Sequence, residues 1–227
     1  MHKTLKIAVA FLVTLGLTGL SGVANAGQST TSNVEAFSGV SSKAPKNSSQ
    51  TFSGTGDDIV TVKTVSASVL VTMTHDGVSN FSVTSKTSND DYIDLLANEI
   101  GPYSGTRIQE LGTSIFTKEK LGLFEVNADG NWTIEIKPLS KAKKWNGKPL
   151  SGTGDLVVQV PKKTKPGNKL IMSHVGDSNF AVITYSSKGG YLDLKANEIG
   201  DYSGKSTFGK SYYIAVETQG AWTLKKK

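Results

Sequence analysis

The sequence NEIGPYSG at residues 98–105 recurs as NEIGDYSG at residues 197–204, with seven of eight positions identical at an offset of 99 residues. A match of this kind indicates an internal repeat. Two further segments support it, because SGTGD at 53–57 returns at 151–155 and GNWT at 130–133 is matched by GAWT at 220–223. The 227-residue chain is therefore predicted to contain two copies of one module, at residues 52–138 and 150–227.

Within each predicted copy, apolar and polar side chains alternate with a period of two. Val69, Val71 and Met73 alternate with other residues in one stretch, and Trp132 and Ile134 do so in another. The stretches are rich in β-branched and aromatic residues and are separated by clusters of Gly, Asn, Asp and Ser, which is typical of half-buried strands. The sequence predicts an all-β protein with two tandem β-sandwich domains of a jelly-roll-like kind.

Three segments outside the copies are predicted to be something other than folded modules. Residues 1–26 have a basic start, an apolar run at 7–13 and a small-residue end at 24–26, as a cleaved secretory signal has. Residues 27–51 are mostly Ser, Thr, Asn, Gln, Gly and Lys, which favours a disordered spacer. Residues 139–149 carry four lysines and end in Pro149, which favours a basic linker. No membrane insertion is expected after signal cleavage.

Charge and cysteine content limit the possible partners. The chain has no cysteine, so an exported protein must be held together by core burial rather than by disulfides. Without the predicted signal, which holds Lys3 and Lys6, the chain has 23 basic and 19 acidic residues, and the resulting net charge of +4 is too small to argue for nucleic acid. Residues 53–138 hold 6 basic and 12 acidic residues, whereas residues 151–227 hold 11 and 6. The two modules either dock through these opposite charges or present separately solvated surfaces.

The sequence offers no catalytic or metal-binding pattern. His75 and His174 are the only histidines after the predicted signal, one per copy and without cysteines, whereas zinc needs three or four ligands. No Gly-x-Ser-x-Gly turn surrounds a serine. Glu99 and Glu198 supply one repeated carboxylate per copy, which does not make a glycosidase pair. We therefore expect no enzyme activity, no cofactor and no metal.

Aromatic and amide side chains are the remaining candidates for ligand contacts. Tyr103 and Tyr202 lie in the repeated segment, where half-exposed rings would stack on sugars. The candidate ligand-binding residues are Tyr103, Tyr202, Asn98, Asn197 and Trp145. An alternative is that the segment is a turn-rich corner that determines the fold, with Gly101 and Gly105 in unusual backbone conformations and the hydroxyl of Tyr103 pinning the corner. Trp132 and Trp222 share the apolar phase of their strands and are assigned to the core.

The order of these motifs resembles a known family. Gly-x-Gly-Asp, His-Asp-Gly-x-Ser-Asn-Phe, Asn-x-Ile-Gly-x-Tyr-x-Gly and Gly-x-Trp-Thr-Ile together are similar to a small secreted β-sandwich module of Gram-positive bacteria. The resemblance implies export and this fold, and it supplies no activity and no catalytic residues. The expected function is that of a secreted, monomeric, non-catalytic protein that binds cell-wall glycan or other carbohydrate at the bacterial surface. The alternative is an extracellular protein-interaction or matrix module that uses the oppositely charged domains.

Overall fold

The computed structural model describes residues 49–112, 119–160 and 167–227, which all belong to one compact unit. The described residues form strands and one short 3₁₀ helix, η1 (Leu139–Lys141), so the protein is all-β as predicted. The predicted signal at 1–26 and residues 27–48 of the predicted spacer lie outside the described residues. The last residues of that spacer belong to the first strand, which begins at Gln50.

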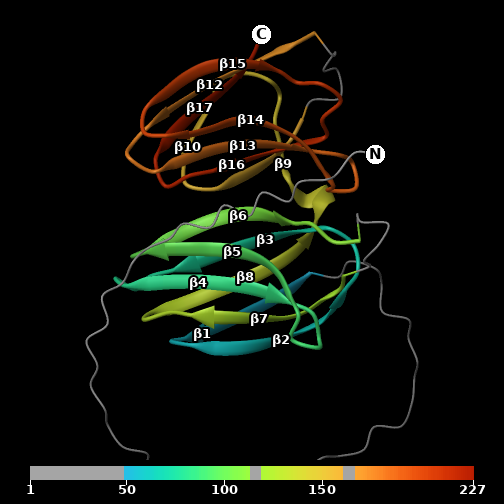
Figure 1. The fold of residues 1–227 in the computed structure, drawn as a ribbon, viewed down its shortest axis with the longest axis vertical. Helices are drawn as coiled ribbons and strands as arrows, with labels where there is room; N and C mark the ends of the chain where they lie inside the picture. The colour runs from blue at the N-terminus through green and yellow to red at the C-terminus, as the bar shows by residue number, and fades with distance from the viewer. Residues whose placement is uncertain (1–48, 113–118, 161–166) are drawn as a thin grey trace, which may run out of the picture. The chain divides into compact units, whose positions relative to one another are not determined.

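Residues 50–138, called the first half, form two antiparallel four-stranded sheets (Figure 1). One sheet has the order β1-β8-β3-β6 and the other the order β2-β7-β4-β5. Each sheet therefore pairs strands from opposite ends of the segment, an arrangement consistent with a jelly-roll-like β-sandwich. The bounds are β1 (Gln50–Thr55), β2 (Asp58–Val65), β3 (Val69–His75), β4 (Asn80–Lys86), β5 (Tyr92–Ile100), β6 (Tyr103–Gln109), β7 (Leu121–Asn127) and β8 (Asn131–Pro138).

Residues 143–226, called the second half, show the same strand orders. The sheet β10-β17-β12-β15 corresponds to β1-β8-β3-β6, and β14-β13-β16-β11 to β5-β4-β7-β2, with β9 added in parallel beside β11. The registers agree as well, because His75 lies opposite Tyr103 and Trp132 just as His174 lies opposite Tyr202 and Trp222. The bounds are β9 (Lys143–Lys144), β10 (Leu150–Thr153), β11 (Leu156–Gln159), β12 (Lys169–Val175), β13 (Asn179–Tyr185), β14 (Tyr191–Ile199), β15 (Tyr202–Thr207), β16 (Tyr213–Glu217) and β17 (Ala221–Lys226).

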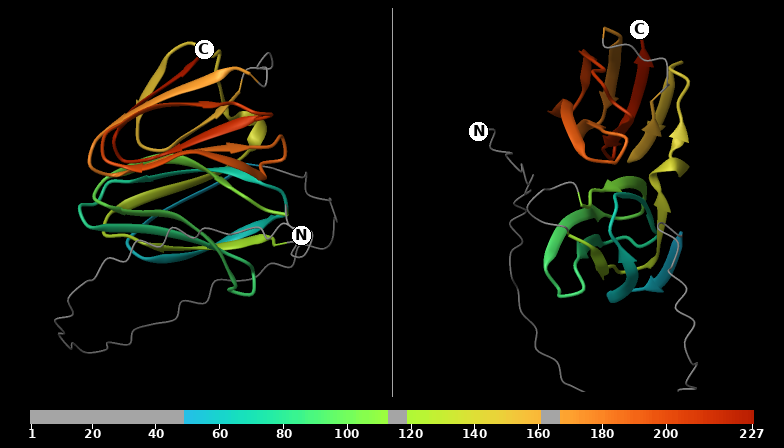
Figure 2. Two further views of the ribbon diagram at one scale, coloured as in Figure 1. Left: turned by 45° about the horizontal axis from the view of Figure 1, so that its top comes forward. Right: turned by 90° about the vertical axis from the view of Figure 1, so that its right-hand side faces the viewer.

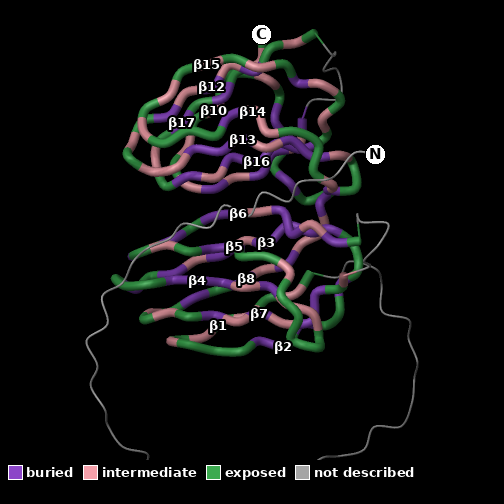
Figure 3. Tube along the Cα trace, in the orientation of Figure 1, coloured by how far each residue is buried: buried purple, intermediate pink, exposed green. Residues whose placement is uncertain are grey.

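The alternating pattern of each strand sends one set of side chains into a core between the two sheets of its half. In the right-hand view of Figure 2 the strands of each half surround a common interior, and Figure 3 shows the buried positions recurring along them. Trp132 and Trp222 are 1% and 2% exposed, which confirms their assignment to the core. The other fully buried large residues include Met73, Phe81 and Phe124 in the first half and Leu170, Met172 and Phe180 in the second.

The repeated glycines make room for these aromatic rings. Gly54 pairs with Trp132 across the sheet, and a Cβ at Gly54 would lie 2.4 Å from the indole ring. Gly152 stands in the same relation to Trp222, at 2.6 Å. The Trp132 indole N–H donates to the carbonyl of Gly56 at 2.9 Å. The repeated SGTGD and G-x-W-T segments are therefore two sides of one packing arrangement.

The segment 98–105 is a corner between β5 and β6, as one of the two readings of the sequence proposed. Gly101 has a φ of 90° and Gly200 a φ of 88°, which favour glycine. The unusual conformation predicted for Gly105 is wrong, because its φ is not positive. Its role is steric, since a Cβ there would lie 2.3 Å from the hydroxyl oxygen of Tyr103. Gly204 and Tyr202 repeat this contact in the second half.

Residues 139–149, assigned to a linker from the sequence, are packed against the rest of the molecule. Leu139 and Ala142 are buried, and β9 pairs with β11. Trp145 is 6% exposed and stacks on Phe208 in the core of the second half, with ring centroids 5.8 Å apart. The connection between the halves is thus part of the second half's fold.

Candidate binding faces

A row of four hydroxyl groups crosses the outer face of the sheet β10-β17-β12-β15. The register places Ser151 opposite Thr223, Thr223 opposite Ser173, and Ser173 opposite Ser203. The row lies on the outer face because the next residues along these strands, among them Trp222 and Met172, fill the core. The side chains of successive strand residues point to opposite faces, so the buried pattern fixes the position of the hydroxyls.

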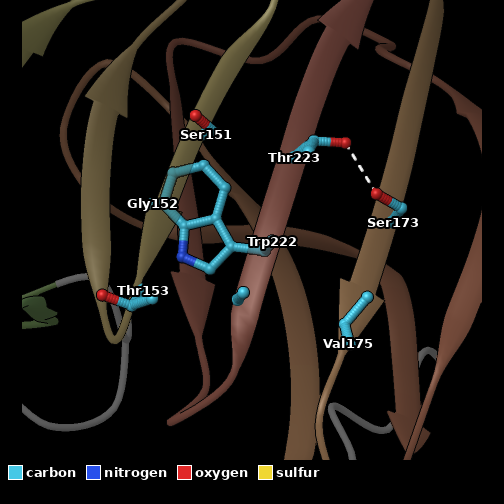
Figure 4. A pocket seen from close by; sticks show the side chains of 8 residues that line it. Ser151, Gly152, Thr153, Ser173, Val175, Trp222 and Thr223 are labelled. Carbon is cyan, nitrogen blue, oxygen red and sulfur yellow. Dashed lines mark hydrogen bonds between the residues drawn. The ribbon is translucent and has the colours of Figure 1, made fainter.

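This face is shallowly hollowed beside the row. The depression has a volume of about 390 Å³ and is lined by Ser151, Gly152, Thr153, Ser173, Val175, Ala221, Trp222 and Thr223. Figure 4 shows the hydroxyls of Ser173 and Thr223 pointing toward one another, and their oxygens are 2.7 Å apart. Val175 is 64% exposed, so the depression combines hydroxyls with apolar surface. None of its lining residues is ionisable at neutral pH, which favours binding over acid–base chemistry at this place.

The first half carries the same row in the same register. Ser53 lies opposite Thr133, Thr133 opposite Thr74, and Thr74 opposite Ser104. The hydroxyl oxygens of Thr74 and Thr133 are 2.6 Å apart, close to the 2.7 Å between their counterparts in the second half. In both halves the third member of the row is half-buried and the other three are exposed. We call these two surfaces, each defined by its four hydroxyl residues, the hydroxyl faces.

The geometry of the hydroxyl faces suits a ligand with many hydroxyl groups. Each Ser or Thr hydroxyl can donate one hydrogen bond and accept others. Neighbouring strands lie about 4.7–4.9 Å apart, so a row across four strands offers evenly spaced polar groups over roughly 14 Å. Sugars present alternating hydroxyls and apolar C–H surface, which matches hydroxyls beside Val175 and Ala221.

A second polar cluster lies where the two halves contact one another. Asp155, just before β11, accepts hydrogen bonds on Oδ2 from the Tyr103 hydroxyl at 2.7 Å and from Nε of Arg107 at 2.8 Å. Arg107 also forms an ion pair with Glu217 at 3.1 Å. The backbone N–H of Thr106 donates to the carbonyl of Asp155 at 3.1 Å. The edge strand β6 of the first half thus meets the β11 and β16 region of the second half.

Apolar side chains surround this contact. Leu70 and Ile108 from the first half form one buried cluster with Val157, Ala215 and Tyr185 from the second. The side chain of Asp155 is 2% exposed, so its charge is removed from water and neutralised by Arg107. A buried ion pair with several hydrogen bonds defines one docked geometry rather than many.

The carboxyl groups of this cluster have shifted proton affinities. Burial, together with the negative charge of Asp155, raises the pKa of the Glu99 carboxyl to about 7, and Arg107 opposes the rise. Burial also raises the pKa of Glu217, again opposed by Arg107. Burial lowers the pKa of Arg107, but Glu217 and Asp155 outweigh burial and raise it above its ordinary value.

Perturbed carboxyl groups often mark active sites, but this cluster has a structural explanation. Oδ1 of Asp155 accepts the backbone N–H of Thr218 at 2.7 Å, and Oδ2 is engaged by Tyr103 and Arg107. A carboxylate with both oxygens committed in this way holds the halves together. We therefore assign the cluster to docking of the two halves.

The two histidines are core residues. The ring of His75 stacks on Phe81 with centroids 4.6 Å apart, and its Nδ1 lies 3.0 Å from the carbonyl of Gly101. His174 repeats both contacts with Phe180 and Gly200. Each histidine is therefore held by the backbone of the turn in its own half. Within the described ranges, no group of three His, Cys, Asp or Glu side chains is arranged to hold a metal ion.

The five residues predicted to bind ligand differ in their exposure to solvent. Tyr103 is 9% exposed and Trp145 is 6% exposed, so neither ring is accessible for stacking. Tyr202 is half-buried, and Asn98 and Asn197 are exposed in β5 and β14. The hydroxyl of Tyr103 bonds Asp155 in the other half, rather than pinning its own corner. The two buried rings are thus excluded from ligand contact, and the hydroxyl faces include none of the five residues.

The hydroxyl faces were missed by sequence reasoning although the signal was present. Each hydroxyl residue of a row is next in sequence to a core residue or to a glycine that packs against an aromatic ring. The Ser-Gly-Thr segments at 53–55 and 151–153 are examples. In a single strand, such a serine or threonine is indistinguishable from any other polar position. Their side-by-side placement depends on strand order and register, which the sequence does not state.

No protein-family model matches this chain, and no curated protein sequence matches it significantly. In the described part of the chain there is no helix that is long and apolar enough to cross a membrane.

Proposed function

We propose that this chain is a secreted, non-catalytic binding protein made of two copies of one β-sandwich module, which binds cell-wall glycan or other polysaccharide at the bacterial surface. The repeated hydroxyl row carries the proposal. It occurs at corresponding register positions in both halves, Ser53 to Ser104 and Ser151 to Ser203. A signal at residues 1–26 would deliver the protein to that surface.

Two faces in one chain favour a polymeric ligand. A polysaccharide with repeated units contacts both hydroxyl faces, and the second contact is then intramolecular, which raises the apparent affinity. Each face alone is small and polar, so single contacts are weak. Retention of the protein on a cell surface requires a sufficient apparent affinity, and two weak sites acting together provide it.

The test is retention on purified peptidoglycan and on insoluble polysaccharides, measured as the bound fraction over a concentration series. Thr223→Val removes a hydroxyl from the second face while keeping the side-chain shape, and Thr133→Val does the same in the first. Each variant should weaken retention several-fold, because a hydrogen bond contributes about 0.5–1.5 kcal/mol. The double variant should lose more than either single variant.

Thr61→Val is the matched control, because Thr61 is exposed on β2 and lies outside both hydroxyl faces. It should bind as the unmodified protein does. Retention on no glycan by the folded protein would overturn the proposal. Unchanged retention by the double variant would assign glycan binding to another surface.

The alternative function is an extracellular protein-interaction module, favoured by the opposite charges of the two halves. Residues 53–138 have a net charge of −6 and residues 151–227 one of +5. Binding through these charges should weaken steeply with salt, whereas binding through the uncharged hydroxyl faces should change little. Retention measured at low and high salt separates the two functions.

A further inference from the structure

The first half has an exposed surface that corresponds to the docking surface of the second half. Asp58 lies opposite Val126 and Ile59 opposite Glu125, in the register that Leu156 and Val157 share with Val216 and Ala215. The preceding aspartates correspond too, because Ala128 donates its backbone N–H to Asp57 Oδ1 at 2.9 Å as Thr218 does to Asp155. We call the surface formed by Asp57, Asp58, Ile59, Glu125 and Asn127 the acidic face.

The acidic face is open where its counterpart is occupied. Asp155 uses Oδ2 to hold Tyr103 and Arg107, whereas Asp57 is exposed. Ile59 is 67% exposed and its counterpart Val157 is 2% exposed. A shallow depression of about 230 Å³ is present at this place, lined by Asp57, Asp58, Ile59, Glu125, Val126 and Asn127. The surface therefore has room, an apolar side chain and negative charge.

Tyr103, Thr106 and Arg107, on the edge strand β6, are the first-half residues that contact the second half's docking surface. This group also has an exposed counterpart in the second half. In the second half, β15 is an edge strand in the same register, since Thr72 pairs with Thr106 and Ile171 with Lys205. Tyr202 stands at the position of Tyr103 and Lys205 at that of Thr106. Ser206 stands at the position of Arg107, and Lys205, one residue before it, is an exposed cation on the same edge strand.

We infer that a second copy of this chain docks its β15 edge on the acidic face, in a head-to-tail contact that repeats the contact between the two halves. Tyr202 would reach Asp57 as Tyr103 reaches Asp155, and Lys205 would face Asp57, Asp58 and Glu125. The charges are complementary, with −6 on residues 53–138 and +5 on residues 151–227. This inference goes beyond the proposed glycan binding and does not depend on it.

The contact is heterologous, so a pair of docked copies keeps one free acidic face and one free β15 edge. Such contacts build open arrays rather than closed dimers unless the rotation closes a ring. The association is weaker than the contact within the chain, because Glu125 and Lys86 stand where the second half has Ala215 and Tyr185. It rests on charge and is therefore sensitive to salt. It differs from the monomer expected from the sequence.

Sedimentation velocity of the purified protein over a concentration series, without glycan, tests the inference. At an ionic strength of about 20 mM the weight-average mass should rise with concentration, and at about 0.5 M it should stay at the monomer value. A monomer at every concentration at low salt overturns the inference. Association that salt does not weaken overturns the charge-based contact.

Two variants break opposite sides of the contact. The double variant Asp57→Asn/Asp58→Asn removes the charge of the acidic face but keeps the oxygens that accept the N–H groups of Ala128 and Ile59. Lys205→Glu reverses the charge of the β15 edge. Each should weaken self-association about tenfold or more. Asp177→Asn and Lys210→Glu, exposed in loops of the second half, are matched controls that should associate normally.

Mixing the two variants gives the sharpest result. The Asp57→Asn/Asp58→Asn protein keeps an intact β15 edge, and the Lys205→Glu protein keeps an intact acidic face. Their mixture should form one-to-one complexes and nothing larger, because only one intact pair of surfaces exists. A contact between two identical surfaces, or capture of a different protein, predicts no such recovery. Failure of the mixture to associate overturns the head-to-tail geometry.

Discussion

The same outer sheet surface is buried in one half of the molecule and exposed in the other. In the second half Val157, Ala215 and Tyr185 are all less than a tenth exposed, because the first half packs against them. In the first half the corresponding positions are Ile59, Glu125 and Lys86, and the last two form an ion pair at 2.7 Å. The inward-facing positions are apolar in both halves, so the outward-facing ones decide whether a surface docks.

This difference shows which residues determine that two copies of one fold dock through different surfaces. The core contacts are the same in both halves, including the tryptophan that packs on a glycine and the histidine that stacks on a phenylalanine. The docked and exposed surfaces differ in a few outward residues on one side of each half. The aspartate before β2 and β11 bonds its own turn in both halves, and only Asp155 has gained Tyr103 and Arg107 as additional partners.

Removing this aspartate should have the most unequal effect in the two halves. Asp155→Ala removes the buried carboxylate that accepts hydrogen bonds from Arg107, Tyr103 and the backbone of Thr218, and should lower the free energy of unfolding by about 3–5 kcal/mol. Asp57→Ala removes one exposed hydrogen bond to Ala128 and should cost about 1 kcal/mol. Denaturant unfolding of both variants measures the difference. Equal losses would show that Asp155 acts only through its own turn.

Exchanging Ala215 and its counterpart Glu125, which face outward on β16 and β7, should give the next largest effect on stability. Ala215→Glu places a charge at a fully buried position of the docking contact and should cost roughly 3 kcal/mol or separate the halves. Glu125→Ala, the reverse change on the exposed surface, removes a partly exposed ion pair with Lys86 and should cost less than about 1 kcal/mol. Denaturation and small-angle scattering together distinguish lost stability from separated halves. Tolerance of Ala215→Glu with an unchanged scattering profile would contradict the docked arrangement.

Much of each core could be predicted from the sequence, because it depends on local pattern. The period of two located the strands, and the shared apolar phase placed Trp132 and Trp222 correctly. The internal repeat predicts that Tyr103 and Tyr202 are equally exposed, and this prediction is wrong. Tyr103 is buried by a contact from the other half, which an internal repeat does not encode.

The docking contact had a signal that local reasoning passed over. Ala215 and Tyr185 are apolar at outward positions of their strands, where the first half has Glu125 and Lys86. Comparing the two copies at outward positions would have marked one surface as covered. Trp145 was placed in a linker because its segment is basic, although its ring belongs to the second core. The hydroxyl faces required strand order, which no local pattern gives.

A smaller and more specific contrast is expected for the two tyrosines. Tyr103→Phe removes the hydroxyl that donates to the buried Asp155 carboxylate, and should cost about 1.5–3 kcal/mol. Tyr202→Phe should change the free energy of unfolding by less than about 0.5 kcal/mol, because its hydroxyl lies on a half-buried edge. Thermal unfolding of the two variants provides the measurement. A comparable loss from Tyr202→Phe would mean that both hydroxyls serve their own corners.

The smallest expected effect depends on pH and compares Glu99 with Glu198. Burial and the charge of Asp155 raise the pKa of Glu99 to about 7, from an ordinary value of 4.5. The folded state therefore holds this proton more tightly than the unfolded state does. Its contribution to stability is present below pH 4.5 and is lost as the pH rises from 4.5 to about 7.

Replacing this carboxyl by an amide should remove that loss. Glu99→Gln should have little effect at pH 4 and should raise the free energy of unfolding by about 1 kcal/mol at pH 8, after allowance for the partial exposure of the group. Glu198→Gln, at the exposed counterpart in the second half, is the matched control for the substitution itself. Denaturant unfolding of both variants beside the unmodified protein gives the comparison. If Glu99→Gln were equally stabilising at pH 4 and pH 8, the charge of Glu99 would not be what the docked halves oppose.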